Sequence, residues 1–145
     1  MKTLLLTTLA VTVGGLSLAQ STAQRFEAPF AFHVGDKQLP AGDYIVQVQN
    51  HGTVILVSSK GHGGGGAFAF GYGVGNPNGP KTATAKLVFN KYEDGNYFLS
   101  QVWGGDWTNG MQTNRSRMER EVVSGKFKPT AQLKPVKVTI LASLK

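Results

Sequence analysis

The stretch from Trp103 to Asn109 holds the residue types best suited to binding a polar ligand. It places four such residues among glycines: Trp103, Asp106, Trp107 and Asn109. Indole faces stack on the apolar faces of sugar rings, and amide and carboxylate groups supply directional hydrogen bonds. We therefore predict a glycan contact here. The alternative is that Trp103 ends a strand inside the core and Trp107 pins the loop over it, since large aromatic side chains are usually core residues.

The positive charge of the chain is concentrated near its end. The formal net charge is +7, and from Met111 onward eight basic residues stand against two acidic ones. Such an excess favours an acidic partner. A solvated surface with no partner is an equal interpretation, and nucleic acid is a weaker one because the segment is poor in aromatic residues. The predicted contacts with an anionic lipid or polysaccharide surface are Arg115, Arg117, Arg120, Lys126 and Lys128.

The residues do not predict a cofactor or a metal site. The chain has no cysteine, which excludes disulfides, thiolate zinc sites and cysteine nucleophiles. The spacing of its histidines, His33, His51 and His62, matches no zinc motif. The glycine-rich run from Gly61 to Gly66 lacks the lysine-serine ending and the following helix of a phosphate loop. We expect neither a bound metal nor a cofactor.

Catalysis is also not predicted. No G-x-S-x-G elbow is present, so the nearness of Ser58 and Ser59 to His62 in sequence carries no weight. Two of the acidic residues, Glu93 and Asp94, are explained by a hairpin turn. We therefore predict a non-enzymatic protein with no catalytic residue. Two alternatives stay open, a small secreted hydrolase acting on cell-wall carbohydrate and a self-assembling surface protein whose strands pair between chains.

The first residues read as an export signal. Lys2 precedes an apolar run from Leu4 to Leu18, and a small-x-small site ends at Ala19. The run is short for a bilayer span. We predict a signal peptide over 1–19, with cleavage after 23 as the alternative, and a mature domain over 20–145 with no transmembrane span. The protein is then secreted, to the bacterial periplasm or the exterior, as a component of the cell envelope.

Alternating apolar residues indicate strands along most of that domain. The clearest are expected over 25–34, 43–49, 53–58, 67–74, 85–92, 97–103 and 134–144. Phe68, Phe70 and Tyr72 share one face of their strand, while the small residues opposite permit close approach. The pattern predicts an all-β, mainly antiparallel single domain, a β-sandwich or small β-barrel of about seven or eight strands. Whether the first and last strands pair, which would close a barrel, is left open.

One short helix is expected after Ser116. The sequence Ser116-Arg-Met-Glu119 matches a capping box, in which Ser116 caps the helix and Glu119 reaches back. A helix of two turns does not hold alone in water, so Met118 and Val122 are expected to pack on the sheet.

Three blocks carry a family resemblance. The run from Pro29 to Tyr44 resembles a PFxFxVGxxxLPAGxYxV opening, and the run from Lys86 to Trp103 resembles a KLVFxxYxxxYFLxxVW block. The segment from Arg115 to Glu121 is similar to an SRAERE-like helix start. In this order they resemble a family of small secreted bacterial proteins of unknown function. The resemblance implies a β architecture and an envelope address, and it implies no activity.

Overall fold

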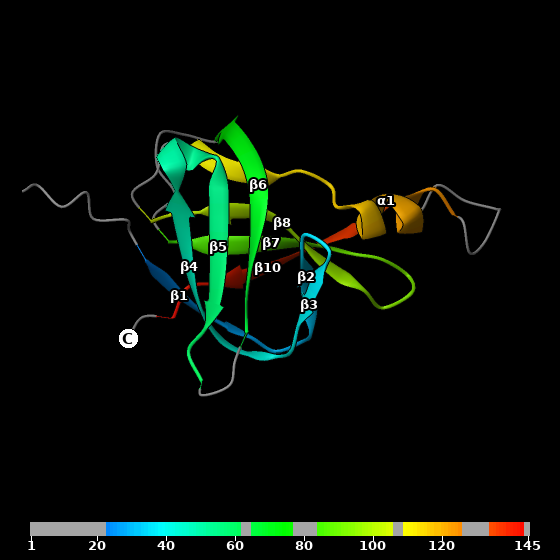
Figure 1. The fold of residues 1–145 in the computed structure, drawn as a ribbon, viewed down its shortest axis with the longest axis horizontal. Coiled ribbons are helices and arrows are strands. Elements are labelled where there is room, and N and C mark those ends of the chain that lie inside the picture. The colour runs from blue at the N-terminus through cyan, green and yellow to red at the C-terminus, as the bar shows by residue number, and fades with distance from the viewer. Residues whose placement is uncertain (1–22, 62–64, 77–83, 106–108, 126–133, 144–145) are drawn as a thin grey trace, which may run out of the picture.

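The chain folds into a β-sheet that curls around one hydrophobic core, shown by the computed structural model in Figure 1. The structure describes residues 23–61, 65–76, 84–105, 109–125 and 134–143. Within them lie ten strands, which confirms the predicted all-β class. These are β1 (Gln24–Ala28), β2 (Phe32–Val34), β3 (Lys37–Leu39), β4 (Gly42–Gln49), β5 (Val54–Ser59), β6 (Gly66–Gly75), β7 (Lys86–Lys91), β8 (Tyr97–Trp103), β9 (Asn109–Thr113) and β10 (Val136–Leu141). A 3-10 turn, η1 (Asn50–Gly52), and one helix, α1 (Arg117–Val123), complete the described elements.

The strands form a nearly closed circuit. Antiparallel pairing runs β1-β4-β5-β6-β9-β8 and continues from β8 to β7 and β10. Just beyond β10, the Ser143 backbone N–H donates to the Arg25 carbonyl of β1 over 2.9 Å. In Figure 1, β4, β5 and β6 stand in front while β7, β8 and β10 cross behind them. The sheet therefore returns to its first strand and takes the form of a small barrel.

The expected strand over 25–34 is two strands, which corrects the sequence prediction. β1 ends at Ala28, and β2 begins only at Phe32. Pro29 cannot donate a ladder hydrogen bond, and the chain bends there. Beyond the bend, β2 pairs with β3 and meets β8 in parallel, with His33 opposite Phe98. Beyond the seven expected ranges the structure has three more strands: the division of 25–34 adds one, and β3 and β9, which no expected range covers, add two.

Aromatic rings dominate the middle of the core. Phe32 makes edge-on contacts with Tyr44 and Phe89, at centroid distances of 5.1 and 5.2 Å. Phe30, at the bend, stacks on Tyr97 at 3.8 Å. Such pairs contribute about 0.5–1.5 kcal/mol each beyond their burial. Phe89 lies opposite Leu99 across β7 and β8.

The helix α1 begins as predicted but packs differently. The Ser116 hydroxyl accepts the Glu119 backbone N–H over 3.1 Å, which confirms the cap. The Glu119 side chain does not reach back. It is buried against the sheet, whereas Met118 is 40% exposed. The expectation that Met118 and Val122 anchor the helix is therefore wrong for Met118, and a hydrogen-bonded carboxyl group takes its place.

Candidate functional site

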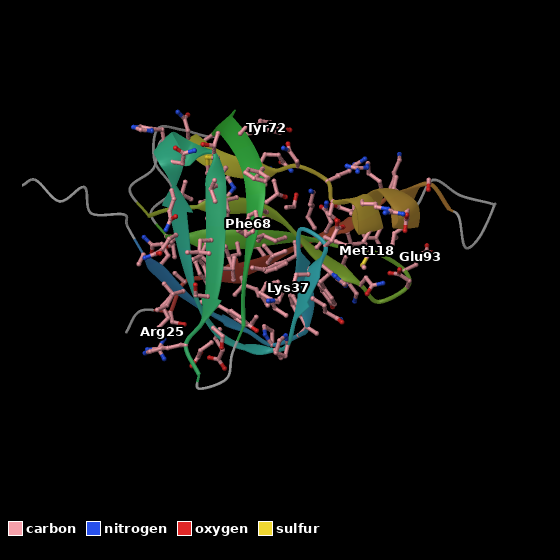
Figure 2. All side chains as sticks on the ribbon, viewed as in Figure 1. Arg25, Lys37, Phe68, Tyr72, Glu93 and Met118 are labelled. Atoms are coloured by element: carbon pink, nitrogen blue, oxygen red, sulfur yellow. The ribbon has the colours of Figure 1, made fainter. Side chains whose placement is uncertain are left out.

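An exposed row of aromatic side chains runs along the outside of β6. Phe68, Phe70 and Tyr72 are 59%, 59% and 55% exposed, and Figure 2 places Phe68 and Tyr72 along the same strand. Phe68 and Phe70 meet edge to face at 5.7 Å. Leaving a large apolar side chain in water forgoes about 1.5–3 kcal/mol of burial free energy. Contiguous exposure of this kind marks a binding surface more often than scattered apolar residues do.

The small residues of β6 explain why the rings point outward. Ala67 and Ala69 face the core and are buried. At Gly71, a β-carbon would lie 2.6 Å from the Gln112 carbonyl oxygen of β9 and 3.5 Å from Ile55. At Gly71 the strand therefore lies too close to its neighbours for a larger residue, whereas a β-carbon at Gly73 would meet nothing within 4 Å. The alternation along β6 then puts every aromatic ring on the solvent side.

Uncharged side chains flank this row on the β5 side. Leu56 lies opposite Phe68, and Val54 lies opposite Phe70. One strand further out, β4 places glutamines, Gln47 and Gln49, opposite Leu56 and Val54. Because directly opposite residues of an antiparallel pair project from the same face, these side chains share the outer surface with the aromatic rings.

Glutamines also flank the row on its other side. Tyr72 lies opposite Gln112 of β9, which in turn lies opposite Gln101 of β8. Gln101 donates to the Gln112 side-chain oxygen over 2.9 Å. We call the combined surface the aromatic face, and none of its residues is charged or buried. Its nine members are Gln47, Gln49, Val54, Leu56, Phe68, Phe70, Tyr72, Gln101 and Gln112.

The glycan contact predicted from sequence is only partly described. Trp103 is 6% exposed, and its ring lies so close to Gly110 that a β-carbon there would be 2.5 Å away. The Lys86 ammonium lies 5.5 Å from the ring centroid. Asn109 is exposed at the start of β9. Asp106 and Trp107 lie outside the described residues, so this four-residue site stays a prediction.

The arginines predicted to meet an anionic surface are exposed around α1. Arg117 forms an ion pair with Glu121 over 3.2 Å. Arg120 donates to the Arg115 carbonyl over 2.7 Å. Two of the three guanidinium groups therefore already have partners on their own segment. Lys126 and Lys128 lie outside the described residues, and the anionic contact stays a prediction.

A buried polar cluster lies beneath α1. The Glu119 carboxyl oxygen accepts from Asn90 over 2.7 Å and from the Tyr92 hydroxyl over 2.8 Å. Burial, and then this bond to Glu119, raise the pKa of Tyr92 well above its ordinary value. Lys137 donates to Asn90 and to Ser100, and desolvation lowers the pKa of its ammonium group. The cluster holds the helix on the sheet, and its described contacts indicate a structural role.

Two adjoining clefts lie at the other end of the barrel, with volumes of about 770 and 440 Å³. Both are lined by Arg25, Gly42 and Asp43. Arg25 and Asp43 form an ion pair over 3.3 Å at the position that the clefts share. These two charged groups thus bind each other. The clefts therefore present fewer free groups for binding a ligand than the aromatic face does.

The sequence indicated the aromatic row but not its exposure. It placed Phe68, Phe70 and Tyr72 on one face, and the opposite small face indicated a close approach without showing which face lies in the core. Among the described residues, no group of three or more histidine, cysteine, aspartate or glutamate side chains is arranged to hold a metal ion. No α-helix in these same ranges is both long enough and apolar enough to cross a membrane.

Comparison with known proteins adds no relative. No family model matches the chain, and neither the curated proteins nor the solved structures contain a match. The resemblance to a secreted β family therefore stays an expectation, as do the signal peptide and the envelope address. Residues 1–22 lie outside the described part of the chain.

Proposed function

We propose that this protein is a secreted, non-enzymatic binding module that holds a neutral polysaccharide against the aromatic face. The observation that carries the proposal is the exposed row of Phe68, Phe70 and Tyr72 between two sets of glutamines. Aromatic rings stack on the C–H faces of sugars, and carboxamides both donate to and accept from sugar hydroxyls. The sequence predicted the same role, glycan binding, for the loop that contains Trp103 and Trp107. The support for it comes from the aromatic face instead.

The absence of charge on the aromatic face favours a neutral ligand. None of its nine residues is an aspartate, glutamate, lysine, arginine or histidine. An anionic lipid or polysaccharide would be held by lysine and arginine side chains, and the exposed arginines lie around α1 instead. Lys37 reaches β6 only at its first residue, where it donates to the Gly66 carbonyl over 2.7 Å.

Strand pairing between chains is limited at β6 by the neighbours that the strand already has. Its first half pairs with β5 and its second half with β9, which lie on opposite sides of it. A strand of another chain could therefore pair only with the short edge that each half leaves on its other side. A second copy of the chain, lying face to face on the rings, is the competing occupant that the experiment must distinguish.

The proposal is tested by calorimetric titration with neutral oligosaccharides built from glucose, mannose or N-acetylglucosamine. Wild-type protein should bind at least one class. Phe70→Ala removes the middle ring and should weaken that binding about tenfold or more, as expected for the loss of an aromatic anchor. Leu141→Ala is the matched control, because Leu141 is 60% exposed on β10, away from the aromatic face. It should bind as wild type does.

Two results would overturn the proposal. In the first, the folded wild-type protein binds none of the three classes. In the second, sedimentation shows a wild-type dimer that Phe70→Ala converts to a monomer, which assigns the aromatic face to a second copy of the chain.

A further inference from the structure

The glutamine pair beside Tyr72 belongs to a longer hydrogen-bonded chain. The Trp103 indole N–H donates to the Gln101 side-chain oxygen over 3.1 Å, and Gln101 donates to the Gln112 oxygen over 2.9 Å. Gln112 then donates to the Ser100 hydroxyl oxygen over 3.2 Å. Lys137 donates to that same oxygen over 3.1 Å. The chain thus runs from a buried indole on β8 to an ammonium group on β10.

The Trp103 end fixes the direction of the bonds through both carboxamides, while the Ser100 hydroxyl that accepts from Lys137 could donate or accept toward Gln112. The indole of Trp103 and the ammonium of Lys137 are donors only. If Gln101 turned its amide over, its NH₂ group would face the indole N–H and two donors would meet. If Gln112 turned over, its NH₂ group would face that of Gln101. Each carboxamide therefore has one favoured orientation, although a glutamine amide can usually be placed either way.

This orientation leaves a fixed pattern of hydrogen-bond donors and acceptors that a ligand can use. In the described bonds, Gln101 and Gln112 each use one oxygen lone pair and one N–H. A carboxamide has two of each, so one acceptor and one donor remain on both side chains. Both residues are partly exposed, and Gln112 lies opposite Tyr72. A sugar ring stacked on Tyr72 brings its edge, with its hydroxyl groups, toward this pair.

We propose that Gln101 and Gln112 select the ligand by the configuration of its hydroxyl groups. Trp103 is then the positioning residue, which holds both amides in the orientation described above. The inference rests on the proposed function, since it names the specificity of the same surface. Stacking tolerates epimers because every pyranose ring has a C–H face. Oriented donors and acceptors do not tolerate epimers, because a hydroxyl group of the other configuration leaves an amide N–H or oxygen of the protein unpaired.

The experiment compares glucose-based and mannose-based oligosaccharides of equal length, whose rings differ in one hydroxyl configuration. Wild-type protein should prefer one by about tenfold or more. Gln112→Met keeps the side-chain length but removes the amide, and it should cut this preference to about twofold. Gln38→Met, at an exposed glutamine of β3 outside the aromatic face, is the matched control and should keep the preference of the wild type.

Trp103→Phe tests the positioning role. It retains an aromatic ring beside Gly110 and removes the indole N–H, so the preference should fall while binding through stacking persists. In NMR spectra of the folded variant, the side-chain NH₂ signals of Gln101 and Gln112 should shift and broaden as the amides turn over. Broadening of those signals reports exchange between amide orientations, whereas the change of ring by itself would only shift them.

The results distinguish a failure of hydroxyl selection from a failure of the proposed glycan binding. Equal affinity of wild type for both epimers, with Phe70→Ala still weakening both, overturns the inference and leaves the proposed function standing. An unchanged preference in Trp103→Phe overturns the positioning role. A wild-type protein that binds neither of these oligosaccharides nor one built from N-acetylglucosamine overturns both.

Discussion

At the scale of single residues, Glu119 shows how a polar group can anchor a helix. It is 3% exposed, and a carboxyl group so placed is costly unless its oxygen is hydrogen-bonded. Asn90 and Tyr92 supply those bonds from the sheet, and the Lys137 ammonium group exerts a favourable Coulombic attraction. The helix is therefore attached by directed bonds instead of a methionine, which leaves Met118 in solvent.

Removing this carboxyl group should destabilise the fold. Glu119→Leu leaves the Asn90 amide and the Tyr92 hydroxyl without their acceptor, at about 1–3 kcal/mol for each buried group. Glu119→Gln keeps an acceptor oxygen and should cost less. Denaturant unfolding measures both. Glu121→Leu, which removes an ion pair from the exposed side of the same helix, is the control and should change the free energy of unfolding by about 0.5 kcal/mol or less. Equal effects at the two positions would contradict the anchoring role.

At the scale of elements, α1 is attached to the β2–β3 hairpin as well as to the barrel. The Asp36 carboxylate, at the tip of the hairpin, accepts the Met118 backbone N–H over 3.0 Å. Together with the Ser116 cap, this bond satisfies two of the N–H groups that the first turn of a helix leaves unpaired. The backbone bond from Met118 is the largest cause that lowers the pKa of Asp36. Desolvation opposes it, and Ser116, Arg120 and Arg117 add smaller lowering effects.

The attachment of α1 should weaken in acid. Because the folded-state pKa of Asp36 lies below its ordinary value of 3.8, the unfolded chain binds protons first as pH falls. The stabilisation is complete above that ordinary value and is lost as pH drops through the folded-state pKa. Denaturant unfolding from pH 7 to pH 2 should show Asp36→Asn less stable than wild type near neutrality, with the difference vanishing in acid.

A surface carboxylate elsewhere controls for general charge effects. Glu93→Gln, in the exposed β7–β8 turn, should not reproduce the pH-dependent difference. A constant gap between Asp36→Asn and wild type across the whole range would contradict the titration of Asp36 as its cause.

Element by element, periodicity predicted the strands well and their orientation less well. Alternation located β4, which has one bulky and one mostly polar face, whereas runs rich in apolar and β-branched residues located β5, β7 and β8. In β6 the alternation is between bulky and small residues, so the pattern alone does not say which side is the core. The answer came from β9, whose backbone approaches Gly71. The bend at Pro29 was signalled by its residue type, but the parallel contact of β2 with β8 joins segments far apart in sequence.

At the scale of the whole molecule, non-local contacts decide the site. Barrel closure depends on a bond between Ser143 and Arg25, near opposite ends of the chain, and no local pattern encodes it. The aromatic face likewise combines residues of β4, β5, β6, β8 and β9. In the sequence, nothing distinguishes its glutamines from other solvent-facing residues of a strand. Only the strand order brings them to both sides of the aromatic row.

The same strand order keeps charge apart from the aromatic face. The exposed arginines gather around α1, so a molecule with a net charge of +7 still presents a neutral surface on β4, β5 and β6. This separation predicts two binding behaviours with different responses to salt. Electrostatic contacts are screened over about 10 Å at 0.1 M ionic strength and about 3 Å at 1 M, whereas stacking and hydrogen bonding to a neutral sugar are not.

Binding to a neutral oligosaccharide should therefore change less than about twofold between 0.1 M and 1 M salt, because it involves no charge pair. Retention on heparin, if the arginines engage it, should disappear over that range and should be lost on charge reversal of Arg115, Arg117 and Arg120. The triple variant should bind the neutral sugar as wild type does, and Phe70→Ala should keep its heparin retention. Sugar binding that vanishes in salt, or that the arginine changes abolish, would place the ligand on the α1 side and leave the aromatic face without it.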